Sequence, residues 1–258
     1  DYLASISADL DARAAEIDPA IQERPEVTLV DWDPEGETKV AAAALYAASD
    51  LPDDHLLAYV RSLTAEARAA LIRTAVGERG NRRHKPGRAM ERTSYRFDIL
   101  SDYGAFRDLQ RHRMLTIEWQ RLSTRHGYIT PDAIADIGAT AAWDEVMERT
   151  ALLAGRIQRA HGSVAAQYAV PFAYRIRYYV DMNAREAFHL LELRSQPSGH
   201  PGYRRIAQDM HRHIRDTAGH HTIADAMQFV DHDSYDLARL EDERRMAARR
   251  AARGIVDE

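Results

Sequence analysis

The segment from Phe172 to Arg194 constrains the fold most, because its hydrophobic period changes once, at Asn183. Bulky apolar residues alternate with polar ones from Phe172 to Val180, as in a strand with one buried face. Beyond Asp181, apolar residues recur at helical spacing: Ala184, Ala187, Phe188 and Leu191. The sequence therefore predicts a strand that leads directly into a helix.

Arg194 ends this apolar stripe. Asn183 and Arg194 are about three helical turns apart, so they share a face with Ala187 and Leu190. Leaving a buried charge unpaired is strongly destabilising. We therefore expect a carboxylate from elsewhere in the fold, or an anionic ligand, to meet Arg194.

A second stretch, from Asp102 to Arg125, has the tripeptide Arg111-His112-Arg113 at its centre. Ser101 or Asp102 can cap a short helix here, with Arg111 in its last turn. Arg107 and Arg111 would then be a like-charge pair, which costs about 0.2–0.5 kcal/mol unless an anion lies between them. A bound phosphate or carboxylate would reverse that sign, but cations near a helix C-terminus also simply complement its dipole.

Composition limits what arginine alone can prove. Only Lys39 and Lys85 are lysines among 35 basic residues, so an arginine indicates anion binding only where a motif places it. The net charge of -5 argues against non-specific nucleic-acid binding, and the absence of cysteine excludes disulfides and thiolate catalysis. No long apolar run or signal-peptide pattern occurs, so we expect a cytoplasmic protein without a membrane segment. The chain begins at Asp1, so we expect a fragment or a processed product.

The predicted architecture is a helix-rich α+β single domain over residues 26–232, with an N-terminal helical arm at 1–25 and a charged C-terminal helix or tail at 233–258. The remaining expected elements are a helix from Asp1 to about Arg24, a strand over Val27–Trp32, helices ending near Ser49 and Val76, a loop from Gly77 to Glu91, a strand around Tyr95–Ile99, a short helix between Pro131 and Gly138, a helix from Thr140 to His161, and a helix around Tyr203–Ile214. The 77–91 loop is either functional or a solvated basic loop.

Four histidines between His211 and His221 raise the question of a metal site: His211, His213, His220 and His221. A His-x-His spacing on a helix turns the two side chains apart, and no carboxylate or cysteine pattern completes a site. We therefore predict structural roles for these histidines and no metal. Neither phosphate-loop fingerprint occurs, so a dinucleotide would not be held by a Rossmann unit.

The tripeptide at Arg111 and the segment NAREAFHLLELR at Asn183–Arg194 together resemble the flavin-dependent thymidylate synthases, also called thymidylate synthase complementing proteins. Three further segments are similar to that family: Glu26–Ser49, Glu91–Ile99, and AQYAVP at Ala166–Pro171. The resemblance implies the family's fold and a homotetramer whose sites draw residues from more than one subunit. It also implies methyl transfer from methylenetetrahydrofolate to dUMP, with FAD as cofactor and NADPH as reductant.

The resemblance also implies site residues. Those matching flavin contacts are Arg111, His112, Arg113, Asn183, Arg185, His189 and Glu91. Those matching nucleotide contacts are Arg111, Ser123, Arg125, Gln167 and Arg194. Arg194 matches the arginine that activates the pyrimidine by favouring ionisation at a ring nitrogen, which is electrostatic stabilisation of developing charge.

Departures from the family pattern concentrate in the nucleotide residues. Arg121 stands where the family has serine, and Ser123 and Arg125 fit only with two residues inserted. Gln167 replaces a phosphate-gripping arginine, for which Arg121 or Arg125 can compensate, and Asp108 replaces a glutamine. Three hypotheses follow: a thymidylate synthase with a rearranged nucleotide loop, a flavoprotein relative acting on another pyrimidine nucleotide, and a non-catalytic member serving as an assembly domain.

Overall fold

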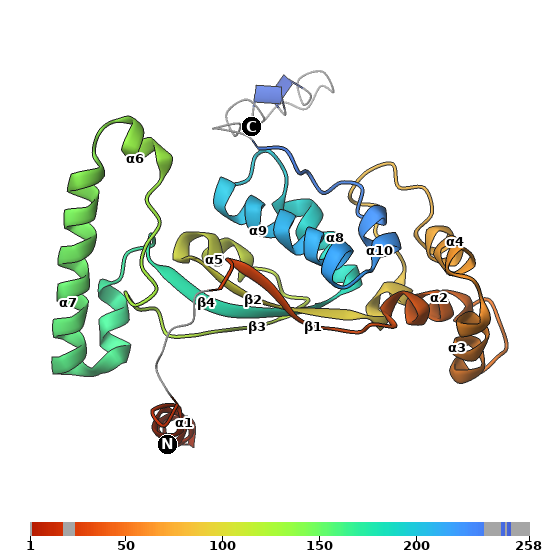
Figure 1. The fold of residues 1–258 in the computed structure, drawn as a ribbon, viewed down its shortest axis with the longest axis horizontal. Coiled ribbons are helices and arrows are strands. Elements are labelled where there is room, and N and C mark those ends of the chain that lie inside the picture. Colours follow the sequence, from red (N-terminus) through yellow and green to blue (C-terminus); the bar gives the residue numbers. More distant parts are fainter. Residues whose placement is uncertain (1, 18–23, 235–243, 246, 249–258) are drawn as a thin grey trace.

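A computed structural model of the chain describes residues 2–17, 24–234, 244–245 and 247–248 (Figure 1). The elements, in chain order, are α1 (Tyr2–Ala14), β1 (Val27–Trp32), α2 (Gly36–Tyr46), α3 (Asp53–Ser62), α4 (Ala65–Val76), η1 (Arg88–Arg92), β2 (Ser94–Asp102), α5 (Tyr103–Leu109), β3 (Thr116–Trp119), α6 (Asp132–Asp136), α7 (Thr140–Ala166), η2 (Gln167–Ala169), β4 (Arg175–Asn183), α8 (Ala184–Arg194), α9 (Pro201–Arg212), η3 (His213–Thr217) and α10 (His221–Ala226). The fold is the predicted helix-rich α+β type.

The centre of the fold is an antiparallel sheet with strand order β1-β2-β4-β3. The long pair β2 and β4 runs in continuous register from Ser94 opposite Asn183 to Asp102 opposite Arg175. Alternate residues of β4 are fully buried on one face, which α5, α8 and α9 cover in Figure 1. The other face carries cross-strand ion pairs, such as Arg177 with Asp98 at 2.7 Å. The sheet is therefore apolar on one side and charged on the other.

Several predicted boundaries are confirmed. β1 covers the predicted residues 27–32, and α8 begins directly after Asn183. Thr64 caps α4 by accepting a hydrogen bond from the Ala67 amide, and α4 ends at Val76 as expected. Asp102, one of the two predicted caps, accepts from the Ala105 amide at the start of α5. Polar caps and period changes therefore marked these ends correctly.

Other boundaries were wrong. The first helix ends at Ala14 rather than near Arg24, because i to i−3 hydrogen bonds at Glu16 and Ile17 tighten its last turn. β4 begins at Arg175, since Pro171 and Tyr174 form a turn before it and Phe172 is exposed. α5 ends at Leu109, which leaves Arg111 beyond the helix. The predicted tail helix over 233–258 lies almost wholly outside the described residues.

The long helix α7 is kinked at Gly162, whose φ of 85° and ψ of 170° interrupt the helix. The expected apolar side of α7 is only partly buried: Met147 and Ala154 are in the core, whereas Val146 and Leu153 are about half exposed. In the part of the chain that the structure describes, every helix is too short or too polar to cross a bilayer.

Three of the four clustered histidines have the structural roles that the sequence predicted. His211 bonds the Ala224 carbonyl at 2.9 Å, and His213 bonds the Val27 carbonyl at 3.2 Å. The buried His220 lies between the Tyr95 hydroxyl, at 2.8 Å, and the Asp33 carbonyl, at 3.0 Å. The His211 bond joins α9 to α10, whereas the His213 and His220 bonds connect the C-terminal segment to β1, the residue after β1, and β2.

Candidate active site

Helix α8 is the element that carries most of the predicted site residues. Asn183 is its N-cap, and the Asn183 side-chain oxygen accepts from the Glu186 amide at 2.9 Å. Seven of the eleven α8 residues are buried, but Arg185, His189 and Arg194 are only partly covered and remain reachable from solvent. The helix therefore packs into the core with one side and presents polar groups with the other.

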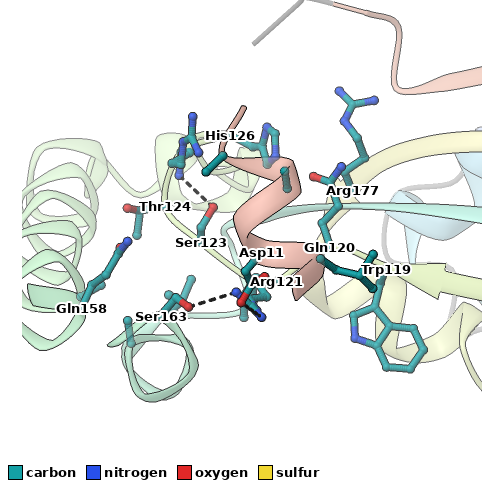
Figure 2. Close-up of a pocket in the computed structure, with 18 of the residues that line it drawn as sticks. Asp11, Trp119, Gln120, Arg121, Ser123, Thr124, His126, Gln158, Ser163 and Arg177 are labelled. Carbon is teal, nitrogen blue, oxygen red and sulfur yellow. Dashed lines mark hydrogen bonds and ion pairs between the residues drawn. The ribbon is translucent and has the colours of Figure 1, made fainter. Parts of the chain in front are cut away.

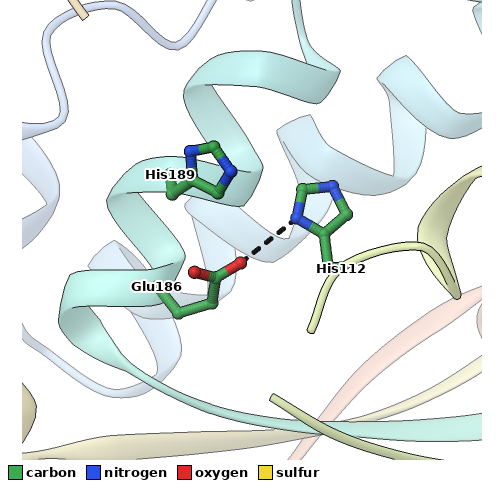
Figure 3. A group of neighbouring side chains, drawn as sticks. All are labelled: His112, Glu186 and His189. Carbon is green, nitrogen blue, oxygen red and sulfur yellow. Dashed lines mark hydrogen bonds and ion pairs between the residues drawn. The ribbon is translucent and has the colours of Figure 1, made fainter. Parts of the chain in front are cut away.

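His112 joins the two motifs. Arg194 Nε donates to His112 Nε2 at 2.9 Å, and His112 Nδ1 lies 3.1 Å from a carboxylate oxygen of Glu186 (Figure 3). Because an arginine can only donate, His112 Nε2 must be unprotonated, and the ring proton on Nδ1 is donated to Glu186. The His112 and Glu186 side chains are both buried, so this chain of hydrogen bonds sets the orientation of Arg194.

Arg194 meets a carboxylate, one of the two kinds of partner that the sequence predicted. Its Nη2 donates to the Asp108 carbonyl at 2.6 Å, and its Nη1 lies 3.7 Å from the Asp108 carboxylate. The Tyr203 ring lies against the guanidinium, with 5.3 Å from the guanidinium carbon to the ring centroid. Burial lowers the pKa of Arg194, although a guanidinium remains charged at any physiological pH.

The Arg111-His112-Arg113 tripeptide divides between interior and surface. His112 points inward, whereas Arg111 and Arg113 are exposed. Arg111 forms an ion pair with Asp108, so this carboxylate contacts a guanidinium from each motif. The two arginines have separate partners, since Arg107 lies over the Tyr103 ring and Arg111 is paired with Asp108.

The loop before η1 closes over the first turns of α8. Arg185 Nε donates to the Pro86 carbonyl at 3.1 Å, and its guanidinium also contacts Glu91 at 3.4 Å. Lys85 Nζ lies 3.0 Å from His189 Nδ1. Burial, followed by the Lys85 charge, lowers the pKa of His189, and burial likewise lowers the pKa of Lys85. These contacts bring the predicted Glu91, Arg185 and His189 to one place.

Arg79 holds the same loop to the core, and sequence reasoning did not single it out. Both of its terminal nitrogens donate to the Glu192 carboxylate at 2.6 Å, and both side chains are almost wholly buried. The guanidinium lies between the rings of Phe188 and Phe229. The loop from Gly77 to Glu91 is therefore neither freely solvated nor loosely attached.

Glu186 is a second residue that the sequence analysis missed. A signal was available, because Asn183 and Glu186 have the spacing of a capping box, in which the glutamate bonds back to the cap. Here the Glu186 side chain turns to His112 instead.

Three of the predicted nucleotide residues, Ser123, Arg125 and Gln167, lie elsewhere, at or beside a cavity of about 1170 Å³, whereas Arg111 and Arg194 lie near α8. The cavity is bounded by the segment after β3, the kinked end of α7 and the N-terminal helix α1 (Figure 2). Ser123 and Arg125 line it, whereas Arg194 and His112 do not. Gln167 lies behind the cavity, where its side-chain oxygen accepts from the Leu122 amide at 3.0 Å. Within one copy, the structure thus separates the predicted site residues into two groups.

His126 also lines the cavity, and no sequence signal marked it. Its Nδ1 atom is buried without a hydrogen-bond partner. Burial first, and then the positive charges of Arg177, Arg125 and Arg175, hold the pKa of His126 below its usual value. This nitrogen therefore has an unused hydrogen-bonding capacity, but it is covered by protein atoms.

The side chains gathered around α8 suit an anionic cofactor better than a metal. We call them the α8 group: Arg111, His112, Arg113, Arg185, Glu186, His189 and Arg194. The ligand atoms of His112, Glu186 and His189 lie within 4.8 Å of one another. However, Lys85 and Arg194 already contact the two rings, and both would repel a cation. The exposed guanidinium groups of Arg111, Arg113 and Arg185 instead have the chemistry that binds the diphosphate of a dinucleotide.

The chain is similar in sequence to known proteins. Residues 28–218 match the family model described as thymidylate synthase complementing protein. A protein of Chlamydia muridarum named UPF0159 protein is 41% identical over 222 residues, covering 86% of this chain and 41% of that protein. One of Thermoplasma acidophilum is 36% identical over 186 residues, covering 72% of this chain and 37% of that protein. The chain thus spans about two fifths of the length of these relatives.

Among solved structures, the fold is similar to a UMP/dUMP methylase, PolB from Streptomyces cacaoi, bound with 5-Br dUMP. The TM-score is 0.63 at 19% sequence identity, covering 83% of this chain and all of that chain. The two chains therefore have the same fold.

Proposed function

Because this chain belongs to the thymidylate synthase complementing protein family, we propose that it catalyses FAD-dependent methyl transfer to dUMP, giving dTMP. Methylenetetrahydrofolate supplies the carbon and NADPH the reducing equivalents. The observation that carries the proposal is the hydrogen bond from Arg194 to His112, which joins the family's two motifs in one buried network.

The residues near α8 fit the cofactor. Arg111, Arg113 and Arg185 would bind the FAD diphosphate, and Asn183, His189 and Glu91 complete the set that matches the family. When bound, FAD supplies the one-carbon relay and the hydride. His112 has a different task, since both its ring nitrogens are already bonded within the protein, to Arg194 and Glu186. It positions Arg194.

Arg194 is the residue proposed to activate the pyrimidine. Its guanidinium has a fixed direction, because His112 holds Nε and the Asp108 carbonyl holds Nη2. Nη1, which lies 3.7 Å from the Asp108 carboxylate, is the nitrogen best placed to be shared with a substrate. A fixed cation at this point stabilises negative charge that develops on the pyrimidine ring without reorganising in the reaction.

We further propose that the active site is completed between copies, in a cytoplasmic homotetramer. Two observations support this assembly. The α8 group and the cavity do not meet within one chain. Apolar side chains along α7 and in the short helix η2 that follows it are also exposed, including Leu152 at 70%, Val164 at 61% and Tyr168 at 94%. Light scattering of the purified chain measures the assembly directly.

The first experiment is the visible absorption spectrum of the protein after FAD is added and unbound FAD removed. A retained, shifted flavin spectrum that changes again on titration with dUMP is expected. Arg194→Ala should keep the flavin but lower the rate of dTMP formation by at least about a hundredfold. Arg73→Ala, at an exposed ion pair on α4, is the matched control and should change neither. A colourless protein, or full activity in Arg194→Ala, would contradict the proposal.

A second candidate substrate is another pyrimidine nucleotide. The observation that favours it is Gln167, whose side-chain oxygen bonds the Leu122 amide, where the family pattern has a phosphate-binding arginine. The S. cacaoi neighbour is itself described as acting on UMP as well as dUMP. Titrating UMP and dUMP into the flavin-loaded protein separates the two substrates. A non-catalytic assembly domain, the third hypothesis, predicts no stable flavin.

A further inference from the structure

One arginine on the charged face of the sheet lacks an acidic partner. On that face, Arg177 pairs with Asp98 at 2.7 Å and Arg96 pairs with Asp181 at 2.9 Å, both between β2 and β4. Arg175, the first residue of β4, has no hydrogen-bond or ion-pair partner for its side chain among residues 2–17, 24–234, 244–245 and 247–248. It is also only partly exposed. The start of β4 therefore holds a half-buried cation without a counter-charge in contact.

The sheet register explains why Arg175 has no partner. Asp102 lies directly opposite it in β2, just as Asp181 of β4 lies directly opposite Arg96. However, Asp102 is the N-cap of α5, and its carboxylate accepts a hydrogen bond from the Ala105 amide at 2.8 Å. Because capping holds this carboxylate at the helix end, it does not pair with the arginine across the strand.

Arg175 lines a cavity of about 450 Å³, which we call the smaller cavity. Its walls also include Leu100 of β2, Thr130 of the segment before α6, and Arg205 of α9. Apart from Arg24, none of its described lining residues belongs to the cavity beside α1. Small-molecule pockets range from about 300 to 1,000 Å³, so the smaller cavity has room for a compact ligand.

The lining of the smaller cavity is positively charged. Arg24, Arg175 and Arg205 oppose a single acidic residue, Glu26, among the described lining residues, so three positive charges meet one negative charge. Arg205 Nε donates to a Glu26 carboxylate oxygen at 2.9 Å, and this pair forms one wall. The remaining charge, near +2, comes from Arg24 and Arg175. The Thr130 hydroxyl, which has no hydrogen-bond partner in the described part of the chain, can donate one further bond.

We propose that the smaller cavity binds a small dianion, either inorganic phosphate or a dicarboxylate, with Arg175 as its principal contact. The chemistry common to both ligands is a group of negatively charged oxygens, which the paired N–H donors of a guanidinium match. The anion supplies the counter-charge that Asp102 does not. This site shares no residue with the α8 group, and the inference does not depend on the proposed function.

A bound dianion would connect elements that are far apart in the sequence. It would contact Arg175 at the start of β4, close to Thr130 before α6 and to the Arg205 wall on α9. A ligand that binds the folded chain and not the unfolded one stabilises the fold. Phosphate or a dicarboxylate should therefore raise the melting temperature, and the rise should depend on Arg175.

The test is isothermal titration calorimetry of the full chain with sodium phosphate and, separately, with sodium succinate, at constant ionic strength. The native chain should bind at least one of them. Arg175→Ala should weaken that binding by about tenfold or more, as expected when a charge-assisted hydrogen bond is lost. Binding of phosphate alone would identify a phosphate site, and binding of succinate alone a dicarboxylate site.

Arg96→Ala is the matched control, because it removes an arginine from the same face of the sheet at a position outside the smaller cavity. It should leave the affinity unchanged. Arg175→Gln keeps a polar side chain and serves if Arg175→Ala does not fold, as judged by circular dichroism. Melting curves give a second readout: the anion should stabilise the native chain and Arg96→Ala, but neither Arg175 variant.

Each result decides the inference. Equal affinities in the native chain and the Arg175 variants would overturn it, as would the absence of binding of both anions to the native chain. Phosphate binding that is lost in Arg125→Ala but kept in Arg175→Ala would place the anion in the cavity beside α1, and would also overturn it. An equal rise in melting temperature with sodium chloride would show general screening instead of a site. Flavin binding is measured separately, so a colourless protein would contradict the proposed function and leave this inference standing.

Discussion

At the scale of single residues, the buried pair of Arg79 and Glu192 dominates the energetics around the site helix. We expect Arg79→Ala to lower the free energy of unfolding by about 3–5 kcal/mol, because Glu192 would keep its charge in the core without a partner. The loop from Gly77 to Glu91 should also become sensitive to protease. Urea denaturation and limited proteolysis measure the two effects.

The matched comparison is Arg92→Ala, which removes an exposed ion pair with Asp53 and should cost at most about 1 kcal/mol. The double variant Arg79→Met/Glu192→Leu should recover much of the lost stability, since it leaves no buried charge. Equal effects of Arg79→Ala and Arg92→Ala would show that the buried pair is not what holds the loop.

The same scale shows what residue patterns can predict. Burial of Arg194 at the end of an apolar stripe predicted a carboxylate or an anionic ligand beside it, because an unpaired buried charge is costly, and the structure shows a carboxylate there. It did not identify Asp108, since 40 acidic residues offer many candidates and only folding brings one alongside. His126 was missed for a similar reason: its significance comes from an unsatisfied nitrogen, which exists only in the folded chain.

At the scale of elements, Asn183 has a structural task in addition to its proposed flavin contact. It caps α8, so Asn183→Ala should lower the free energy of unfolding by about 0.5–2 kcal/mol. It should also weaken FAD binding, because Glu186 and through it His112 depend on the first turn of the helix. Thermal melts and flavin titration follow the two effects.

Asn183→Asp separates these tasks, since aspartate is an equally good cap. This variant should keep the native stability and still bind FAD more weakly, because it places a negative charge near the diphosphate. Loss of FAD in Asn183→Ala without any loss of stability would contradict the capping role.

Helices and strands with a clear periodic spacing of apolar residues were predictable, and those without such a spacing were not. β1 and the transition from β4 to α8 follow from alternation and helical spacing. β3 was missed, because Thr116–Trp119 is four residues long, mostly exposed, and formed only by pairing with β4. The predicted end of α5 was also wrong, because the error is only a few residues and the spacing of apolar residues does not fix a helix end that closely.

At the scale of the whole molecule, buried histidines should make stability depend on pH. Burial is the first cause that lowers the pKa of each of five histidines: His126, His189, His211, His220 and His232. A lowered pKa means that the folded chain resists protonation, whereas the unfolded chain takes up protons near pH 6.5. The stabilisation is therefore complete above about pH 6.5 and is lost as pH falls through the folded-state pKa values.

We expect the melting temperature to be nearly constant from pH 7.5 to about pH 6.5 and to fall between pH 6.5 and pH 5. The loss should be at most about 1.4 kcal/mol per pH unit for each histidine that stays neutral. His220→Gln removes one such group, so it should lower stability at pH 7.5 but reduce the slope below pH 6.5. A flat or rising profile over this range would contradict the expectation.

The sequence predicted the type of fold, but not where the site residues lie relative to one another. Motif residues indicated the family and its fold, which the family match and the solved neighbour support. Nothing in the spacing indicated that the flavin and nucleotide residues would lie in separate places within one copy. Nor did it indicate that α1 would lie over the cavity, because the hydrogen bonds there join Arg121 to Ser7 and Asp11, which no sequence pattern connects.

The packing of α8 bears on how such a protein can acquire new substrates. Buried α8 residues alternate closely with the proposed flavin-binding and catalytic ones, so most changes there alter folding and chemistry together. The cavity segment from Arg121 to Arg125 has no helix or strand, and apart from Leu122 its side chains lie outside the core. Substitutions that favour a different nucleotide can therefore accumulate in the cavity segment with little loss of stability, whereas most substitutions in α8 would be removed by selection. This division would let specificity drift across a lineage while the cofactor chemistry is inherited unchanged.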